Sequence, residues 1–164
     1  CGYCRRHLHK TMPALKEAYI DSGRVLYVFH DFAPDTRQPH ARQAAEAARC
    51  AAEQDGYWAY RQRLFDNQKA LHPDFLASHA DAAGLDPATF QACLDRGPEH
   101  RQGALDAKLG RRLRVRGTPT FFIGRLTGEG SKVALLHRLS GAQSFDRFAE
   151  GIEAAEGAAT VSLR

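Results

Sequence analysis

Two cysteines separated by two residues open the chain, in the sequence Cys1-Gly2-Tyr3-Cys4. At the start of a helix this spacing brings both sulfur atoms onto one face, close enough to bond. There the free N–H groups and the helix dipole favour negative charge, so we expect a lowered pKa for the Cys1 thiol. Because the thiolate is the reactive form, the motif predicts thiol–disulfide exchange, with Cys1 attacking and Cys4 resolving the mixed disulfide. Tyr3 is expected to present its ring to a substrate beside the sulfur.

A metal site is the alternative for the same stretch, which offers the possible ligands Cys1, Cys4, His7 and His9. The first three of these are spaced to share one helical face, whereas His9 points elsewhere. The chain has no second CxxC or suitably spaced histidine pair to complete a tetrahedron. The sequence therefore favours a redox pair over zinc, with no metal and no cofactor. His7 follows Cys4 by one turn, which makes it a candidate for influencing the pair.

A proline opens the apolar run that begins near residue 120, in the sequence Gly117-Thr118-Pro119-Thr120. Proline is tolerated in the trans form at the first position of a strand. An X–Pro bond also adopts the cis form at modest cost. The local sequence leaves both forms open.

The elements that must position these residues follow from periodicity and from breaks at glycine and proline. Residues 1–19 have the spacing of a helix, which Pro13 should kink. Residues 25–29 are apolar and rich in β-formers, which predicts a strand. Further helices are predicted at 41–54, 57–67, 74–83, 87–94, 98–113 and 144–155, with a hairpin formed by 118–124 and 133–139. The apolar residues expected in the core of the helical stretch are Trp58, Leu64, Phe65, Leu71, Phe75, Leu76, Phe90 and Leu94.

The length of 164 residues fits one domain, or one domain carrying an insertion, and 43% hydrophobic and 26% charged residues are typical of a globular protein. The net charge of +4 includes a basic patch at Arg111, Arg112, Arg114 and Arg116. No aromatic platform or nucleic-acid motif accompanies this patch, so we interpret it as a solvated helix end and expect no nucleic-acid partner. Cys50 and Cys93 are either buried free thiols or a disulfide, and the even number of cysteines favours the disulfide.

Taken together, the chain resembles the DsbA-like branch of the thioredoxin superfamily. The resemblance rests on the CGYC motif, on the run from Gly117 to Gly124, on Pro39-His40-Ala41, on residues 44–58 and 84–86, and on Leu139-Ser140-Gly141-Ala142-Gln143. It implies an α/β thioredoxin fold interrupted by an all-helical insertion, with residues 1–39 and 114–164 forming the thioredoxin part and residues 40–113 the insertion. It also implies that Pro119 is cis and lies against Cys1, and that the backbone of Thr118 pairs with bound substrate.

Family members are exported bacterial proteins that oxidise, reduce or reshuffle cysteines in other proteins. The resemblance therefore implies a periplasmic or otherwise exported monomer with cysteine-containing clients and a membrane redox partner. In this family the CxxC motif follows a central strand, so we expect further residues upstream of Cys1. The Gly-Tyr dipeptide is familiar from DsbC-type isomerases, which leaves oxidase, isomerase and reductase open. A domain that binds peptides without catalysis, or one that senses redox state within a larger protein, is the remaining alternative.

Overall fold

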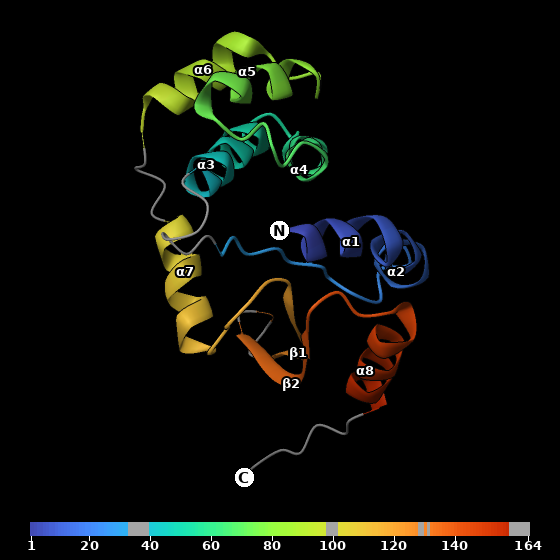
Figure 1. Cartoon of the computed structure of the whole chain (residues 1–164). Helices are drawn as coiled ribbons and strands as arrows, with labels where there is room; N and C mark the ends of the chain where they lie inside the picture. Colours follow the sequence, from blue (N-terminus) through green and yellow to red (C-terminus); the bar gives the residue numbers. More distant parts are fainter. Residues whose placement is uncertain (33–39, 98–101, 128–129, 131, 158–164) are drawn as a thin grey trace. The chain divides into compact units, whose positions relative to one another are not determined.

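The computed structural model describes residues 1–32, 40–97, 102–127, 130 and 132–157 (Figure 1). The chain divides into two compact units, one formed by residues 1–27 and 117–164 and the other by residues 28–116. The second unit begins earlier than the expected insertion because the segment after Tyr27 packs onto its helices. The guanidinium of Arg61 lies 3.7 Å from the ring centroid of Phe29, and Asp31 accepts a hydrogen bond from Arg49.

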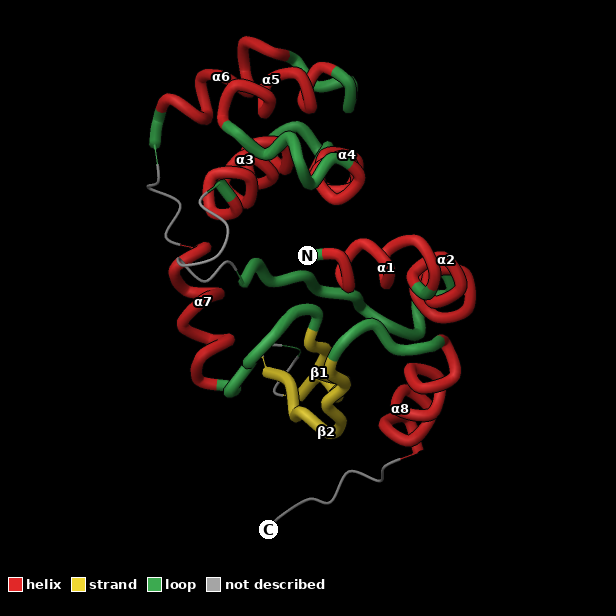
Figure 2. The backbone as a smooth tube through the Cα atoms, viewed as in Figure 1, coloured by secondary structure: helices red, strands yellow, loops and turns green. Residues whose placement is uncertain are grey.

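The first unit begins with the helical elements α1 (Gly2–Lys10), α2 (Met12–Leu15) and the π-helical turn η1 (Lys16–Ile20) (Figure 2). The interruption predicted for Pro13 falls at Thr11, whose hydroxyl donates to the carbonyl oxygen of Gln143 at 2.8 Å. Pro13 lies in the first turn of α2, where a missing N–H costs little. The expected helix over residues 1–19 is thus present, but in three segments.

A two-stranded antiparallel sheet follows, formed by β1 (Thr120–Thr127) and β2 (Lys132–Ser140). Thr120 pairs with Ser140, and a bulge interrupts the register between Ile123 and Gly124. This is the predicted hairpin. The closing helix α8 (Phe145–Gly157) packs on β1, and a Cβ at Gly151 would lie 2.7 Å from Ile123. The core of this unit gathers Leu15, Tyr19, Phe148 and Ile152.

The prediction of a strand at residues 25–29 is wrong. This segment has no regular secondary structure, and the side chain of Leu26 is 72% exposed. A β-strand exists only where a neighbouring strand accepts and donates its backbone hydrogen bonds. Among the described residues, β1 and β2 pair with each other, so the segment runs outside the sheet.

The second unit contains the helices α3 (Ala41–Ala52), α4 (Tyr57–Asp66), α5 (Pro73–Asp81), α6 (Pro87–Asp95) and α7 (Gln102–Arg112). Each overlaps a predicted helix, and residues 98–101 of the expected helix before Leu113 lie outside the described residues. Asp86 is the N-cap of α6, because its side chain accepts the N–H of Thr89 at 2.8 Å. Within the described part of the chain, every helix is too short or too polar to cross a membrane.

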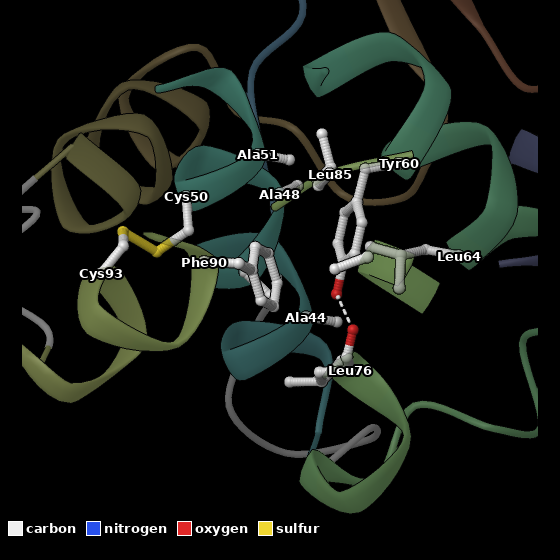
Figure 3. Close-up of a cluster of buried hydrophobic side chains, with 12 residues drawn as sticks. Ala44, Ala48, Cys50, Ala51, Tyr60, Leu64, Leu76, Leu85, Phe90 and Cys93 are labelled. Carbon is white, nitrogen blue, oxygen red and sulfur yellow. Dashed lines mark hydrogen bonds between the residues drawn. A yellow bond between two sulfur atoms is a disulfide. The ribbon is translucent and has the colours of Figure 1, made fainter. Parts of the chain in front are cut away.

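Small residues on α3 allow the other helices of this unit to approach closely (Figure 3). Around these alanines, Tyr60 and Phe90 are completely buried, and the Tyr60 hydroxyl donates to the Leu76 carbonyl at 3.1 Å. Trp58 and Phe75 were expected in this core, but both are about half exposed, at 49% and 48%. On the same two helices, the buried positions are taken by Tyr60, Leu64 and Leu76 instead. Helical spacing alone does not show which face is buried when both faces carry apolar residues.

Candidate active site

Cys1 is the N-cap residue of α1, and its Sγ atom accepts a hydrogen bond from the N–H of Cys4 at 3.3 Å. Both cysteines are half-buried. The first turn of α1 carries no acidic residue. A donated N–H and the positive end of the helix dipole both favour the thiolate form of Cys1. The position of Cys1 is therefore the one expected for a reactive cysteine.

The second part of the candidate site comes from the segment that enters β1. The Thr118–Pro119 peptide bond is cis. The Cys1 thiol donates to the carbonyl oxygen of Thr118 at 3.2 Å, so this segment lies directly against the first cysteine. The N–H of Gly141, which follows β2, donates to the Pro119 carbonyl at 2.8 Å and ties the segment to the hairpin. Cys1, Thr118 and Pro119, singled out from the sequence, therefore lie together.

Tyr3 projects from the exposed side of α1, with 59% of the residue accessible. The Arg6 guanidinium lies 5.3 Å from the centroid of its ring, one turn further along the helix. An exposed aromatic ring beside a half-buried sulfur offers an apolar surface at low cost in conformational entropy.

His7 is the residue of α1 that faces inward, and it is 3% exposed. Its ring centroid lies 4.4 Å from that of Phe121 on β1 and 5.3 Å from that of Phe148 on α8. The helix that carries both cysteines is thus anchored to the sheet and to the closing helix through an imidazole. Its distance of one turn from Cys4 was visible in the sequence, whereas its burial between two phenylalanine rings was not.

A buried charged cluster in the helical unit was missed by the sequence analysis. Asp106 on α7 is buried and accepts hydrogen bonds from Arg49 at 2.7 Å and from the His30 ring at 3.0 Å. Arg49 also donates to Asp31 at 3.0 Å. Burial raises the pKa of Asp31, the Arg49 charge opposes this, and the Asp106 charge adds to it. These residues are far apart in sequence, and no local pattern distinguishes them from solvated charges.

The remaining cysteines, Cys50 on α3 and Cys93 on α6, are joined by a disulfide whose Cα atoms are 5.6 Å apart (Figure 3). The four arginines of the basic patch, Arg111, Arg112, Arg114 and Arg116, are exposed at and beyond the end of α7. Within the described residues, no three histidine, cysteine or acidic side chains gather as metal ligands would.

Comparison with known proteins identifies the family. A family model described as Thioredoxin matches residues 1–139, and the chain therefore belongs to this thioredoxin family. Two solved structures share its fold. BdbD from Bacillus subtilis superposes with a TM-score of 0.74 at 21% identity, covering 94% of this chain and 81% of its own. The α-DsbA1 protein of Wolbachia pipientis superposes with a TM-score of 0.75 at 22% identity, covering 100% of this chain and 84% of its own. The fold is accordingly that of DsbA-like proteins, a thioredoxin fold with added helices.

The similar proteins include antiporters and disulfide bond formation proteins. The Na⁺/H⁺ antiporter NhaA 3 of Salinispora tropica is 35% identical over 75% of this chain, which matches only 18% of the antiporter. A probable disulfide bond formation protein D of Bacillus cereus is 25% identical over 75% of this chain and 60% of its own length. The chain thus spans about a fifth of the antiporter relatives and three fifths of this second relative.

Proposed function

We propose that the chain is a protein thiol–disulfide oxidoreductase that forms or exchanges disulfides in exported client proteins through Cys1 and Cys4. One observation carries the proposal. Cys1 caps α1 with its sulfur bonded to the Cys4 N–H, while the same sulfur meets the Thr118 carbonyl beside the cis bond to Pro119. Disulfide exchange requires a cysteine whose thiolate is stabilised and a second cysteine close enough to resolve the mixed disulfide. The Thr118–Pro119 segment adds backbone beside the first sulfur where a client can bind.

In the oxidising direction, a client thiolate attacks Cys1 of the Cys1–Cys4 disulfide, and Cys4 leaves as a thiolate. A second client thiolate then attacks the client sulfur of this mixed disulfide, and Cys1 leaves. Two electrons pass from the client to the Cys1–Cys4 pair, and the client gains a disulfide. Thr118 and Pro119 would hold the client segment beside Cys1, and Tyr3 would contact its side chains.

Oxidase, isomerase and reductase differ in the stability of the Cys1–Cys4 disulfide. The donated N–H at Cys1 supports the oxidase, because it stabilises the reduced form through its thiolate. Equilibration of the pair with a glutathione series measures this directly. A reduction potential near about −120 mV supports the oxidase, whereas a value near about −270 mV would replace it with a reductase of the thioredoxin kind.

The disulfide between Cys50 and Cys93 supports an oxidising compartment, because thiols of cytosolic proteins are kept reduced. We therefore propose a periplasmic or otherwise exported location, with cysteine-containing proteins as clients and a membrane protein as the redox partner. We also propose that the protein acts as a monomer. Sedimentation of the purified protein and fractionation of cells that express it from its own gene would test these two statements.

A second candidate function rests on the antiporter relatives, of which this chain matches a segment at 35% identity. The chain would then be a redox domain that reacts with, or belongs to, a membrane cation–proton antiporter. A Cys4→Ser variant distinguishes the candidates, because it leaves a mixed disulfide unresolved. Exported client proteins in the trapped adducts would support the first function, and an antiporter as the main adduct would support the second.

A further inference from the structure

The exposed surface of α1 beside the redox pair is basic. Arg5, Arg6 and Lys10 are all exposed on this helix, which contains no aspartate or glutamate. Tyr3 is exposed as well, and the Arg6 guanidinium lies 5.3 Å from the centroid of its ring. Because residues three and four apart share a helical face, Tyr3, Arg6 and Lys10 form one stripe along the helix. We call these three residues and the neighbouring Arg5 the basic face of α1.

The stability of α1 does not explain its basic face. The positive end of a helix dipole lies at the N-terminus, where acidic side chains are favourable and basic ones are not. Arg6 and Lys10 are four residues apart, and like charges at this spacing destabilise a helix. No acidic residue of α1 compensates for them. An anionic group brought by another molecule would therefore be favourable at this surface.

Three basic side chains elsewhere in the same unit have acidic partners. The ion pairs are Lys16–Asp21, Arg24–Glu156 and Arg147–Glu150. All three lie outside α1, on η1, on the segment that follows it and on α8. Within the described part of the chain, Arg5, Arg6 and Lys10 form no ion pair with an acidic residue. The basic face thus concentrates positive charge within three helical turns of Cys1.

We infer that the basic face of α1 selects client segments that carry aspartate or glutamate near the cysteine that reacts with Cys1, an inference that rests on the proposed function. The helical rise places Arg6 about 7.5 Å and Lys10 about 13.5 Å along the axis from Cys1. An extended client advances about 3.3 Å per residue, so acidic side chains about two to four positions from its cysteine reach this face. Charges at such a surface act mainly on the rate of association and make it depend on salt.

Two synthetic dithiol peptides test this selection. They are identical except at three positions beside the first cysteine, which are aspartate in one peptide and asparagine in the other. Each reduced peptide is mixed with the oxidised protein at low ionic strength, and mass spectrometry of acid-quenched samples gives the rate of peptide oxidation. The measured quantity is the rate for the aspartate peptide divided by the rate for the asparagine peptide.

We expect this ratio to fall about 3–10-fold in the variant Arg5→Gln/Arg6→Gln. The aspartates also alter the thiols of their own peptide, but this effect is the same for both proteins. Any change in the reactivity of Cys1 is likewise the same for both peptides, so neither effect enters the comparison. The ratio for the wild type should also fall as salt is added, because salt screens exposed charges.

The matched control is Arg125→Gln/Lys132→Gln, which removes the same charge from exposed positions of the hairpin, toward the end opposite Pro119. It should keep the wild-type ratio, and an equal fall in the control would reduce the effect to net charge and overturn the inference. If Arg5→Gln/Arg6→Gln does not fold, the salt series of the wild type decides, and a ratio that is constant with salt would overturn the inference.

The remaining outcomes separate this inference from the proposed function. Oxidation of both peptides with an unchanged ratio in Arg5→Gln/Arg6→Gln would overturn the selection of acidic clients and leave the proposed function intact. If the unchanged ratio is joined by a loss of binding to phosphatidylglycerol vesicles in this variant, the basic face serves an anionic membrane instead. A wild-type protein that oxidises neither peptide would overturn the proposed function and the inference with it.

Discussion

The Sγ atom of Cys1 lies 3.2 Å from the carbonyl oxygen of Thr118, a residue 117 positions further along the chain. Between these two residues the chain builds all the helices of its second unit. The contact therefore belongs to the tertiary fold, unlike the bond from the Cys4 N–H, which arises within one turn of helix. Because the carbonyl can only accept, it bonds the thiol of Cys1, and the helix N–H remains to stabilise the thiolate.

Substitution of each cysteine in turn should separate their roles. We expect Cys1→Ser to abolish disulfide transfer, because the attacking sulfur is lost. Cys4→Ser should still react with a client disulfide and then accumulate as a mixed disulfide, because the resolving thiol is missing. Mass spectrometry of the acid-quenched proteins, after incubation with a disulfide-containing client, measures both outcomes.

The double variant Cys50→Ala/Cys93→Ala is the matched control for this pair, since it removes two cysteines outside the motif. It should retain transfer at low temperature. Equal transfer by Cys1→Ser and wild type would contradict the assignment of Cys1. Adducts formed equally by Cys1→Ser and Cys4→Ser would contradict the division of roles.

The same double variant makes a prediction about stability. The disulfide joins residues 43 positions apart, on α3 and α6, and so restricts the unfolded chain. Its loss should lower the free energy of unfolding by about 2–4 kcal/mol. Urea unfolding followed by circular dichroism measures the change, and Cys1→Ser/Cys4→Ser serves as the control with two other thiols removed. Equal midpoints for wild type and the alanine variant would show that the bond does not stabilise the native state.

Much of this molecule could be predicted from local signals. The prolines near the starts of α5 and α6, the apolar hairpin and the CGYC motif are signals that span a few residues each. The structure has the corresponding elements where they were expected. The strand at residues 25–29 failed because a strand also needs a partner, which a local pattern does not supply. Trp58 failed as a core residue because α4 is apolar on more than one face.

Contacts between residues far apart in the chain could not be predicted from local sequence. The cis form of the bond before Pro119 was implied by resemblance alone, since both isomers satisfy the local sequence. The cluster of Asp31, Arg49 and Asp106 joins a loop to two helices, and each residue looks like a solvated charge until the chain folds. The same is true of His7, whose neighbours come from β1 and α8.

Gly124→Ala should destabilise the hairpin that carries the Pro119 segment. Gly124 lies at the bulge of β1, and an added Cβ would come within 2.3 Å of the backbone oxygen of Ala134. Because backbone must move to admit the methyl group, we expect a loss of about 1–3 kcal/mol in unfolding free energy. Gly103→Ala on α7 is the control, since its Cβ would meet nothing within 4 Å. Urea midpoints that fall equally in both variants would contradict this steric explanation.

Asp31→Asn should change how stability depends on pH. Burial raises the pKa of Asp31, with Arg49 opposing the shift and Asp106 adding to it. The native state therefore holds this proton to higher pH than the unfolded chain, and stability is lost as pH rises through the native pKa. The amide carries no such proton, so the variant should lose less unfolding free energy between pH 4 and 7. Urea unfolding across this range measures the difference, with Asp81→Asn on the exposed face of α5 as the matched substitution. Parallel curves for wild type and Asp31→Asn would contradict the linkage.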